Sequence, residues 1–129
     1  MPRILIVDDD RANRQLTAEV LRTAGHTVSE AGTAREALAR CKANRPDLVL
    51  LDLILPDRTG VDLLGELKAL WPELQVVFLT AYPEVRSAVE AMRRGAAEYL
   101  PNQVRDHDHL FHVRIVLVRI QMYTAPAER

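Results

Sequence analysis

The sequence has few of the residues that several specialised classes of protein require. It contains one cysteine, so an internal disulfide is excluded, and Cys41 in its helical pattern reads as a small buried apolar side chain. Its 17 basic residues are offset by 18 acidic ones, giving a net charge of −1. That balance excludes the broad basic surface on which nucleic-acid binding depends. Only two of the basic residues, Lys42 and Lys68, are lysine.

Long apolar runs are also missing. No run approaches the roughly 20 residues of a membrane span, and a strand pattern that begins at Ile4 leaves no room for a signal peptide. We therefore expect a cytoplasmic protein without direct contact to membrane or nucleic acid. The 129 residues support one domain, which we place at residues 1–123, with 124–129 as a short tail or the start of a linker.

Short apolar runs recur along the chain, separated by segments with helical periodicity. The expected strands are residues 4–7, 27–30, 48–51, 76–79 and 98–100. The first, third and fourth of these are apolar throughout and too short for a helix. Such runs are typical of strands buried on both faces of a parallel sheet.

Four helices are predicted between the strands. Their expected apolar faces are Leu16, Val20 and Leu21; Ala34, Ala37, Leu38 and Cys41; Leu63, Leu64, Leu67 and Leu70; and Val85, Ala88, Val89 and Met92. Gly25, Trp71-Pro72 and Gly95 are expected to end helices, while Thr33 and Glu36 have the spacing of a capping box. Repeated strand–helix units predict a doubly wound α/β sheet, in which ligands bind beyond the carboxyl ends of the strands.

Acidic residues follow two of the predicted strands. Asp8, Asp9 and Asp10 come after the first and Asp52 after the third. Carboxylates on neighbouring loops repel one another unless a cation lies between them, and their hard oxygen atoms suit Mg²⁺. Asp10 is better explained as the N-cap of the next helix. Asp52 interrupts an apolar run, where an unpaired carboxylate is costly, and beside a divalent cation it can act as a nucleophile toward phosphorus.

Thr80 follows the fourth predicted strand. Its hydroxyl group can donate a hydrogen bond to a phosphoryl oxygen. A strand-terminal threonine that bonds to the backbone explains the residue equally well.

Four segments then match one family in order and spacing. They are Ile4–Asp10, Asp47–Asp57 with Gly60 after it, Phe78–Ala81 and Gly95–Leu100. Over residues 1–101 the sequence resembles the CheY-like receiver domain of two-component response regulators. The resemblance implies a single flavodoxin-like sheet of five parallel strands in the order 2-1-3-4-5, with helices on both faces.

The resemblance also implies a phosphorylation site. Asp52 would accept a phosphoryl group from a phosphohistidine of a sensor histidine kinase or phosphotransfer protein. The ligands of Mg²⁺ would be Asp8, Asp9, Asp52 and the backbone carbonyl of Ile54. Thr80 and the Ala81 backbone would bind the phosphoryl group, and Tyr99 would change rotamer. The fourth helix, fifth strand and fifth helix would then contact a downstream protein or a second copy. Such a domain is no enzyme beyond its own phosphorylation and dephosphorylation.

The pattern breaks after the fifth strand. The family places a lysine and a proline there, but this chain has Asn102 and Gln103, and no lysine follows Lys68. Arg58 or Arg105 as a substitute cation is disfavoured, because a guanidinium group is bulkier and planar and nothing in the sequence places either residue near Asp52. One interpretation is a phosphoacceptor with weakened signalling. The alternative is a degenerate pseudo-receiver that binds or dimerises whatever its phosphorylation state. A phosphatase or phosphotransferase with an aspartate nucleophile is disfavoured, because a chain of this length has no insertion to cover a substrate.

The last segment, residues 107–123, is predicted to form a helix with apolar residues beyond one stripe, so we expect it to contact a partner or a second copy. Its histidines, His107, His109 and His112, do not share one helical face. They are interpreted as solvated or capping side chains rather than as a metal site.

Overall fold

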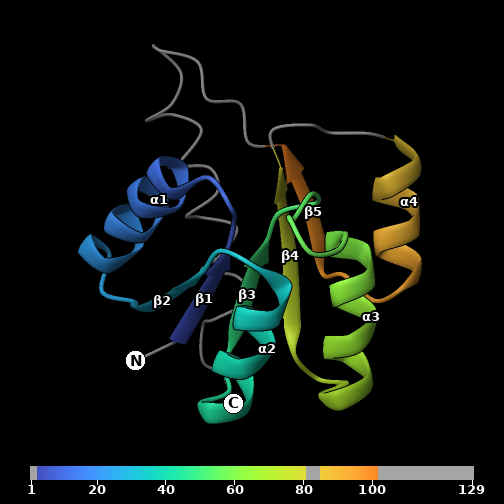
Figure 1. Cartoon of the computed structure of the whole chain (residues 1–129), viewed down its shortest axis with the longest axis horizontal. Coiled ribbons are helices and arrows are strands. Elements are labelled where there is room, and N and C mark those ends of the chain that lie inside the picture. Colours follow the sequence, from blue (N-terminus) through green and yellow to red (C-terminus); the bar gives the residue numbers. More distant parts are fainter. Residues whose placement is uncertain (1–2, 81–84, 102–129) are drawn as a thin grey trace, which may run out of the picture.

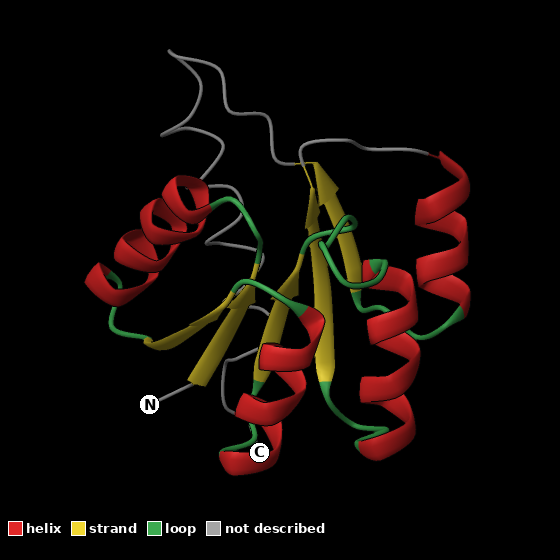
Figure 2. Ribbon diagram, viewed as in Figure 1, coloured by secondary structure: helices red, strands yellow, loops and turns green. Residues whose placement is uncertain are grey.

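Strands and helices alternate regularly in the described part of the chain (Figures 1 and 2). This computed structural model describes residues 3–80 and 85–101, without the side chains of Thr80, Val85 and Pro101. The elements are β1 (Arg3–Val7), α1 (Arg11–Thr23), β2 (Thr27–Ala31), α2 (Ala34–Ala43), β3 (Leu48–Leu51), α3 (Gly60–Leu70), β4 (Gln75–Thr80), α4 (Val85–Arg93) and β5 (Glu98–Pro101).

The five strands form one parallel sheet in the order β2-β1-β3-β4-β5, as predicted (Figure 1). Its register determines what meets at the carboxyl edge. Val7 pairs with Leu51, so the residues that follow them, Asp8 and Asp52, leave the sheet side by side. Leu51 in turn pairs with Phe78, which brings the end of β4 to the same edge.

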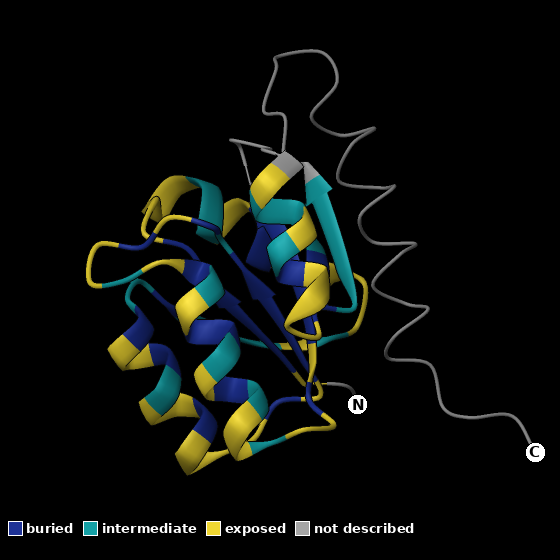
Figure 3. Ribbon diagram, turned by 90° about the vertical axis from the view of Figure 1, so that its right-hand side faces the viewer, coloured by how far each residue is buried: buried dark blue, intermediate teal, exposed yellow. Residues whose placement is uncertain are grey.

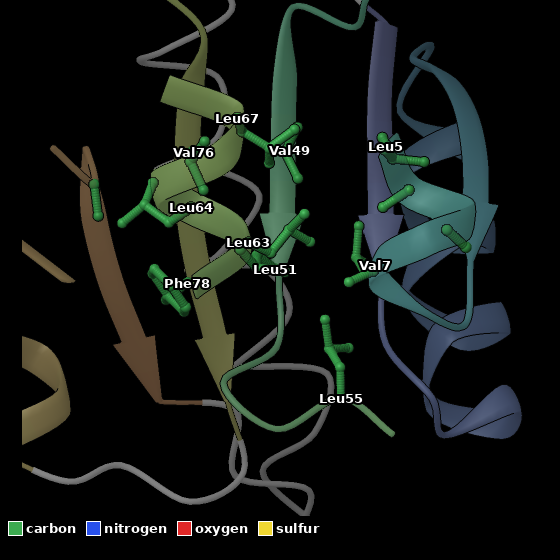
Figure 4. Packing of buried hydrophobic residues seen from close by; sticks show 14 of the residues in the cluster. Leu5, Val7, Val49, Leu51, Leu55, Leu63, Leu64, Leu67, Val76 and Phe78 are labelled. Atoms are coloured by element: carbon green, nitrogen blue, oxygen red, sulfur yellow. The ribbon is translucent and has the colours of Figure 1, made fainter. Parts of the chain in front are cut away.

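Alternate side chains of the central strands pack in two separate cores, one on each face of the sheet. In β1, Leu5 and Val7 face the larger core, which also contains residues of α2, α3 and α4. Ile4 and Ile6 face the smaller one with Ala18 and Leu21 of α1. Figure 4 shows the larger core, with side chains of α3 packed over β3 and β4. Because both faces are covered, β3 is apolar at every position, and β1 is apolar at every position after Arg3.

Helix ends follow the predicted chemistry. The side chain of Asp10 accepts from the Asn13 amide at 3.1 Å and that of Thr33 from the Glu36 amide at 3.0 Å. Both residues are therefore N-caps, as the sequence indicated. Gly25 and Gly95 follow α1 and α4 with φ of 98° and 99°, a conformation in which a side chain would be strained.

Some predicted helix faces were wrong in detail. Leu16, Leu70, Val89 and Met92 are exposed, while Ala91 of α4 is fully buried. In α4 the small side chain of Ala91, rather than the larger apolar ones, packs in the core, so the interpretation based on Val89 and Met92 fails there. Figure 3 shows the outcome, with buried strands at the centre and exposed residues along the outer faces of the helices.

Cys41 was interpreted correctly. It is buried in α2, and burial raises the pKa of its thiol to about 11. The predicted helix at 107–123 with its three histidines lies outside the described residues, and the domain boundary at 123 stays a prediction. Within residues 3–80 and 85–101, no helix is long and apolar enough to cross a membrane.

Candidate metal centre

Three carboxylates meet at the carboxyl edge of the sheet. Asp8 and Asp9 follow β1 and Asp52 follows β3, and one carboxylate oxygen of each lies within 4.8 Å of the others. They line a cavity of about 320 Å³ together with Asp10, Asn13, Ile54 and Leu79. The register of β1 and β3 thus brings together residues that are more than 40 positions apart in the sequence.

Asp8 is the buried member of this group. Its Oδ1 accepts from the backbone amide of Asp10 and its Oδ2 from Nδ2 of Asn13, both at 2.9 Å. Burial raises the pKa of the Asp8 carboxyl, and the two hydrogen bonds only partly oppose this effect. A cation beside it would favour the charged form that burial disfavours.

Asp52 is half-buried and held through its backbone. Its amide donates to the carbonyl of Val7 at 2.9 Å, continuing the ladder between β1 and β3 by one residue. Its Oδ1 accepts from the backbone amide of Leu53 at 2.7 Å. The side chain is therefore fixed at the cavity without being enclosed.

Residues 52–59, the acceptor loop, are tied to the fold at several points. Ile54 pairs with Thr59 in an antiparallel bridge, and the amide of Gly60 donates to the carbonyl of Leu53 at 2.7 Å. Asp57 accepts from the first amides of α2, those of Ala34 and Arg35, at 2.9 and 3.0 Å. These hydrogen bonds lower the pKa of Asp57. The loop that carries Ile54 is thus anchored on both α2 and α3.

The packing around Gly60 leaves no room for a side chain between it and the backbone of Asp52. A Cβ atom there would lie 2.2 Å from the carbonyl oxygen of Asp52 and 2.9 Å from Cε1 of Phe78. Phe78 also stacks on Tyr99, with ring centroids 5.7 Å apart. A continuous packed path therefore connects the backbone of Asp52 with Tyr99 on β5.

Two residues near the cavity were not anticipated from the sequence. Nη1 of Arg14 donates to the Asp8 carbonyl at 2.7 Å, and its Nε donates to Glu30 on β2 at 3.1 Å. Asn13 contacts the Asp8 carboxylate from the same helix turn. The sequence signal was the position of both residues in the first turn of α1, directly after the Asp10 cap.

Neither lysine belongs to this edge of the sheet. Lys42 lies in the last turn of α2, and Lys68, near the end of α3, donates to the carbonyl of Leu74 at 3.2 Å. Helices of parallel strand–helix units run opposite to the strands. The C-terminal ends of α2 and α3, which carry the two lysines, therefore lie away from the carboxylates. Arg58 forms an ion pair with Glu66 of α3, which raises the pKa of its guanidinium group. Because Arg58 already pairs with Glu66, it does not replace the family lysine beside Asp52.

Several predicted site residues lie outside what the structure describes. Thr80 ends β4 at the expected edge, but only its backbone is described. Ala81, Asn102, Gln103 and Arg105 fall outside the described residues. Their roles stay predictions.

The donor set suits a hard divalent cation. Carboxylate oxygens from Asp8, Asp9 and Asp52 are the ligands that Mg²⁺ or Ca²⁺ takes, whereas softer ions prefer imidazole or thiolate. Beside such an ion a carboxylate oxygen of Asp52 could act as a nucleophile toward phosphorus. The arrangement therefore fits metal-assisted phosphoryl transfer onto an aspartate.

Comparison with known proteins decides the family. Residues 4–114 match the response regulator receiver domain. The chain belongs to this family. Regulatory protein LuxO of Vibrio vulnificus is 40% identical to the receiver domain over 95 residues, which are 74% of this chain and 21% of LuxO. Transcriptional regulatory protein ZraR of Escherichia coli is 39% identical over 107 residues, 83% of this chain and 24% of ZraR. The receiver domain thus spans a fifth to a quarter of these relatives.

Solved structures agree with the fold. The CheY-like receiver domain protein of Methanospirillum hungatei has a TM-score of 0.85 at 33% identity, covering 95% of this chain and 92% of that one. A response regulator of Burkholderia pseudomallei, with a TM-score of 0.76 and 26% identity over 97% of this chain and 74% of that one, contains a phosphorylated aspartic acid and a calcium ion. The expected receiver fold is confirmed by these likenesses.

Proposed function

We propose that this receiver domain is the phosphoacceptor of a two-component signalling system, with Asp52 as the residue phosphorylated. The observation that carries the proposal is the convergence of Asp8, Asp9 and Asp52 at one cavity. The aspartyl phosphate and calcium ion of the Burkholderia relative support it, because they show what this fold can hold.

In the proposed reaction a carboxylate oxygen of Asp52 attacks the phosphorus atom of a phosphohistidine. The new O–P bond forms as the P–N bond breaks, and the imidazole of the donor leaves with the electron pair of that bond. The donor is a sensor histidine kinase or a phosphotransfer protein. Asp8, Asp9, Asp52 and the Ile54 carbonyl would hold Mg²⁺, which would neutralise charge on the phosphoryl oxygens.

The chain would then switch a surface rather than catalyse a further reaction. The Thr80 hydroxyl and the Ala81 amide would bind phosphoryl oxygens, drawing the end of β4 toward Asp52. Phe78 lies two residues before Thr80 and stacks on Tyr99, so such a movement reaches β5 by direct packing. The proposed output surface is α4, β5 and the segment after it, in contact with a downstream protein or a second copy.

Signalling is proposed to be atypical because the family lysine is Asn102. An amide donates a hydrogen bond without charge, and charge-assisted hydrogen bonds are about twice as strong as neutral ones. Both lysines lie at the other ends of α2 and α3, and Arg58 pairs with Glu66, so none of these three cations replaces the family lysine. The coupling of phosphorylation to the switch should be weak.

The alternative is a pseudo-receiver that acts without phosphorylation. Beryllofluoride with Mg²⁺ separates the two, because this complex mimics a phosphoryl group on aspartate. We expect a fluorine NMR signal of the bound adduct with the wild-type chain and none with Asp52→Asn. Absence of an adduct with the wild type at millimolar Mg²⁺ would favour the pseudo-receiver.

A further inference from the structure

One polar side chain in the wall of the acidic cavity is only half satisfied. Asn13, in the first turn of α1, lines the cavity with Asp8 and Asp52. Its Nδ2 donates to Oδ2 of Asp8 at 2.9 Å. Its Oδ1 is buried and, across residues 3–80 and 85–101, accepts no hydrogen bond. Buried polar atoms of side chains are nearly always hydrogen-bonded, so this oxygen needs an explanation.

The orientation of the amide group follows from its neighbour. If the group were turned around, Oδ1 would face an oxygen of the Asp8 carboxylate and both would be acceptors. The charge on Asp8 thus directs Nδ2 toward itself and leaves Oδ1 on the other side of the amide. The unpartnered acceptor is therefore a consequence of the acidic site.

The helix does not require this side chain. The backbone amide of Asn13 donates to Oδ1 of Asp10 at 3.1 Å, and its carbonyl accepts from Oγ1 of Thr17 at 3.0 Å. Neither bond uses the Asn13 amide group, and asparagine is a poorer helix former than alanine. Its presence in the first turn is thus explained by the cavity rather than by α1.

We propose that Asn13 is a positioning residue of the metal centre. Its Nδ2 holds the Asp8 carboxylate in place at the cavity where the cation would bind, although this orientation leaves its Oδ1 buried and unpaired among the described residues. Residues that hydrogen-bond metal ligands fix the orientation of those ligands. This inference rests on the proposed function, since it assigns a role around the same Asp8–Asp9–Asp52 site.

The first test compares two variants of the full chain. Asn13→Ala removes the hydrogen bond to Asp8, while Gln15→Ala removes an exposed amide from the same helix and serves as the control. We expect Mg²⁺ to bind Asn13→Ala about tenfold more weakly in isothermal titration calorimetry, as for other residues that support metal ligands. Gln15→Ala should bind it like the wild type. Equal affinity in Asn13→Ala and wild type would overturn the inference.

The second test needs no variant. In the wild-type chain, the side-chain ¹⁵N signal of Asn13 should shift as Mg²⁺ is added, with the same midpoint as the calorimetric titration. A signal that stays in place while Mg²⁺ binds would overturn this role and leave the proposed function intact. If the wild type binds no Mg²⁺, the proposed function and this inference fail together.

Discussion

Two acidic loops at the same edge of the sheet treat their carboxylates in opposite ways. In the metal loop, residues 8–10, burial raises the pKa of Asp8, so the fold disfavours the charge it holds there. In the acceptor loop, the amides of Ala34 and Arg35 lower the pKa of Asp57, so the fold favours that charge. A buried carboxylate whose pKa is raised indicates a cation site, because a cation would stabilise its charged form. A carboxylate whose pKa is lowered by the amides at a helix N-terminus instead attaches its loop to that helix.

The largest effect on stability is expected at Gly60, the first residue of α3, because its backbone packs closely against the acceptor loop. Gly60→Ala would place Cβ 2.2 Å from the Asp52 carbonyl oxygen, so we expect the free energy of unfolding to fall by about 1–3 kcal/mol. Gly65→Ala, in the same helix, meets only the end of the Arg94 side chain at 3.7 Å and should raise it by about 0.5–1 kcal/mol. Urea unfolding followed by Trp71 fluorescence measures the stability of both variants. Equal effects would show that the backbone of Asp52 does not constrain Gly60.

In the metal loop, Asp8 should be required for the ion and unfavourable without it. Asp8→Asn should weaken Mg²⁺ binding at least tenfold, as expected for losing a ligand where supporting residues alone cost 10–100-fold. In Mg²⁺-free buffer at neutral pH the same variant should be more stable than the wild type. Glu19→Gln is the control, because it removes an exposed carboxylate of α1 that does not line the cavity. If Asp8→Asn binds Mg²⁺ like the wild type, Asp8 is not a ligand.

The two loops should also differ in how pH affects stability. The Asp57 pKa is lowered, so its contribution is present above the ordinary value of 3.8 and is lost as pH falls through the folded-state pKa. The Asp8 pKa is raised, so its contribution is present below 3.8 and is lost as pH rises through the folded-state pKa.

Urea unfolding of Asp57→Asn and Asp8→Asn in Mg²⁺-free buffer from pH 3 to 7 measures this difference. Relative to the wild type, Asp57→Asn should lose stability increasingly as pH rises, and Asp8→Asn should gain it. If the stability of both variants relative to the wild type changes in the same direction as pH rises, Asp57 and Asp8 do not differ in the way proposed.

The smallest effect is expected at Arg58. Its ion pair with Glu66 is exposed to solvent, and such pairs contribute little. Arg58→Gln should leave both the unfolding midpoint and the yield of phosphorylated Asp52 nearly unchanged, as measured by thermal unfolding and Phos-tag electrophoresis. A large loss of phosphorylation would show that Arg58 reaches the acceptor after all.

The sequence predicted the strands, the N-caps and the strand-end carboxylates correctly, because each of these features depends on a local pattern of residues. Ile4–Val7 is apolar throughout, and Asp10 has the residue type and place of an N-cap. The resemblance supplied the strand order, which local patterns do not contain.

What the sequence could not supply depends on the docking of elements. The burial of Ala91 in place of Met92 depends on how closely α4 approaches the core. The contact between Asp57 and the first amides of α2 joins segments more than 20 residues apart. Asn13 beside Asp8 required knowledge of where the first turn of α1 points.

We propose that the two loops together make Asp52 a metal-dependent phosphoacceptor. Intact-protein and peptide mass spectrometry after incubation with a small phosphodonor such as acetyl phosphate tests this directly. We expect one added phosphoryl group, located on Asp52, in the presence of Mg²⁺ and none after chelation with EDTA or in Asp52→Asn. Phosphorylation that is independent of Mg²⁺, or that appears on another residue, would contradict it.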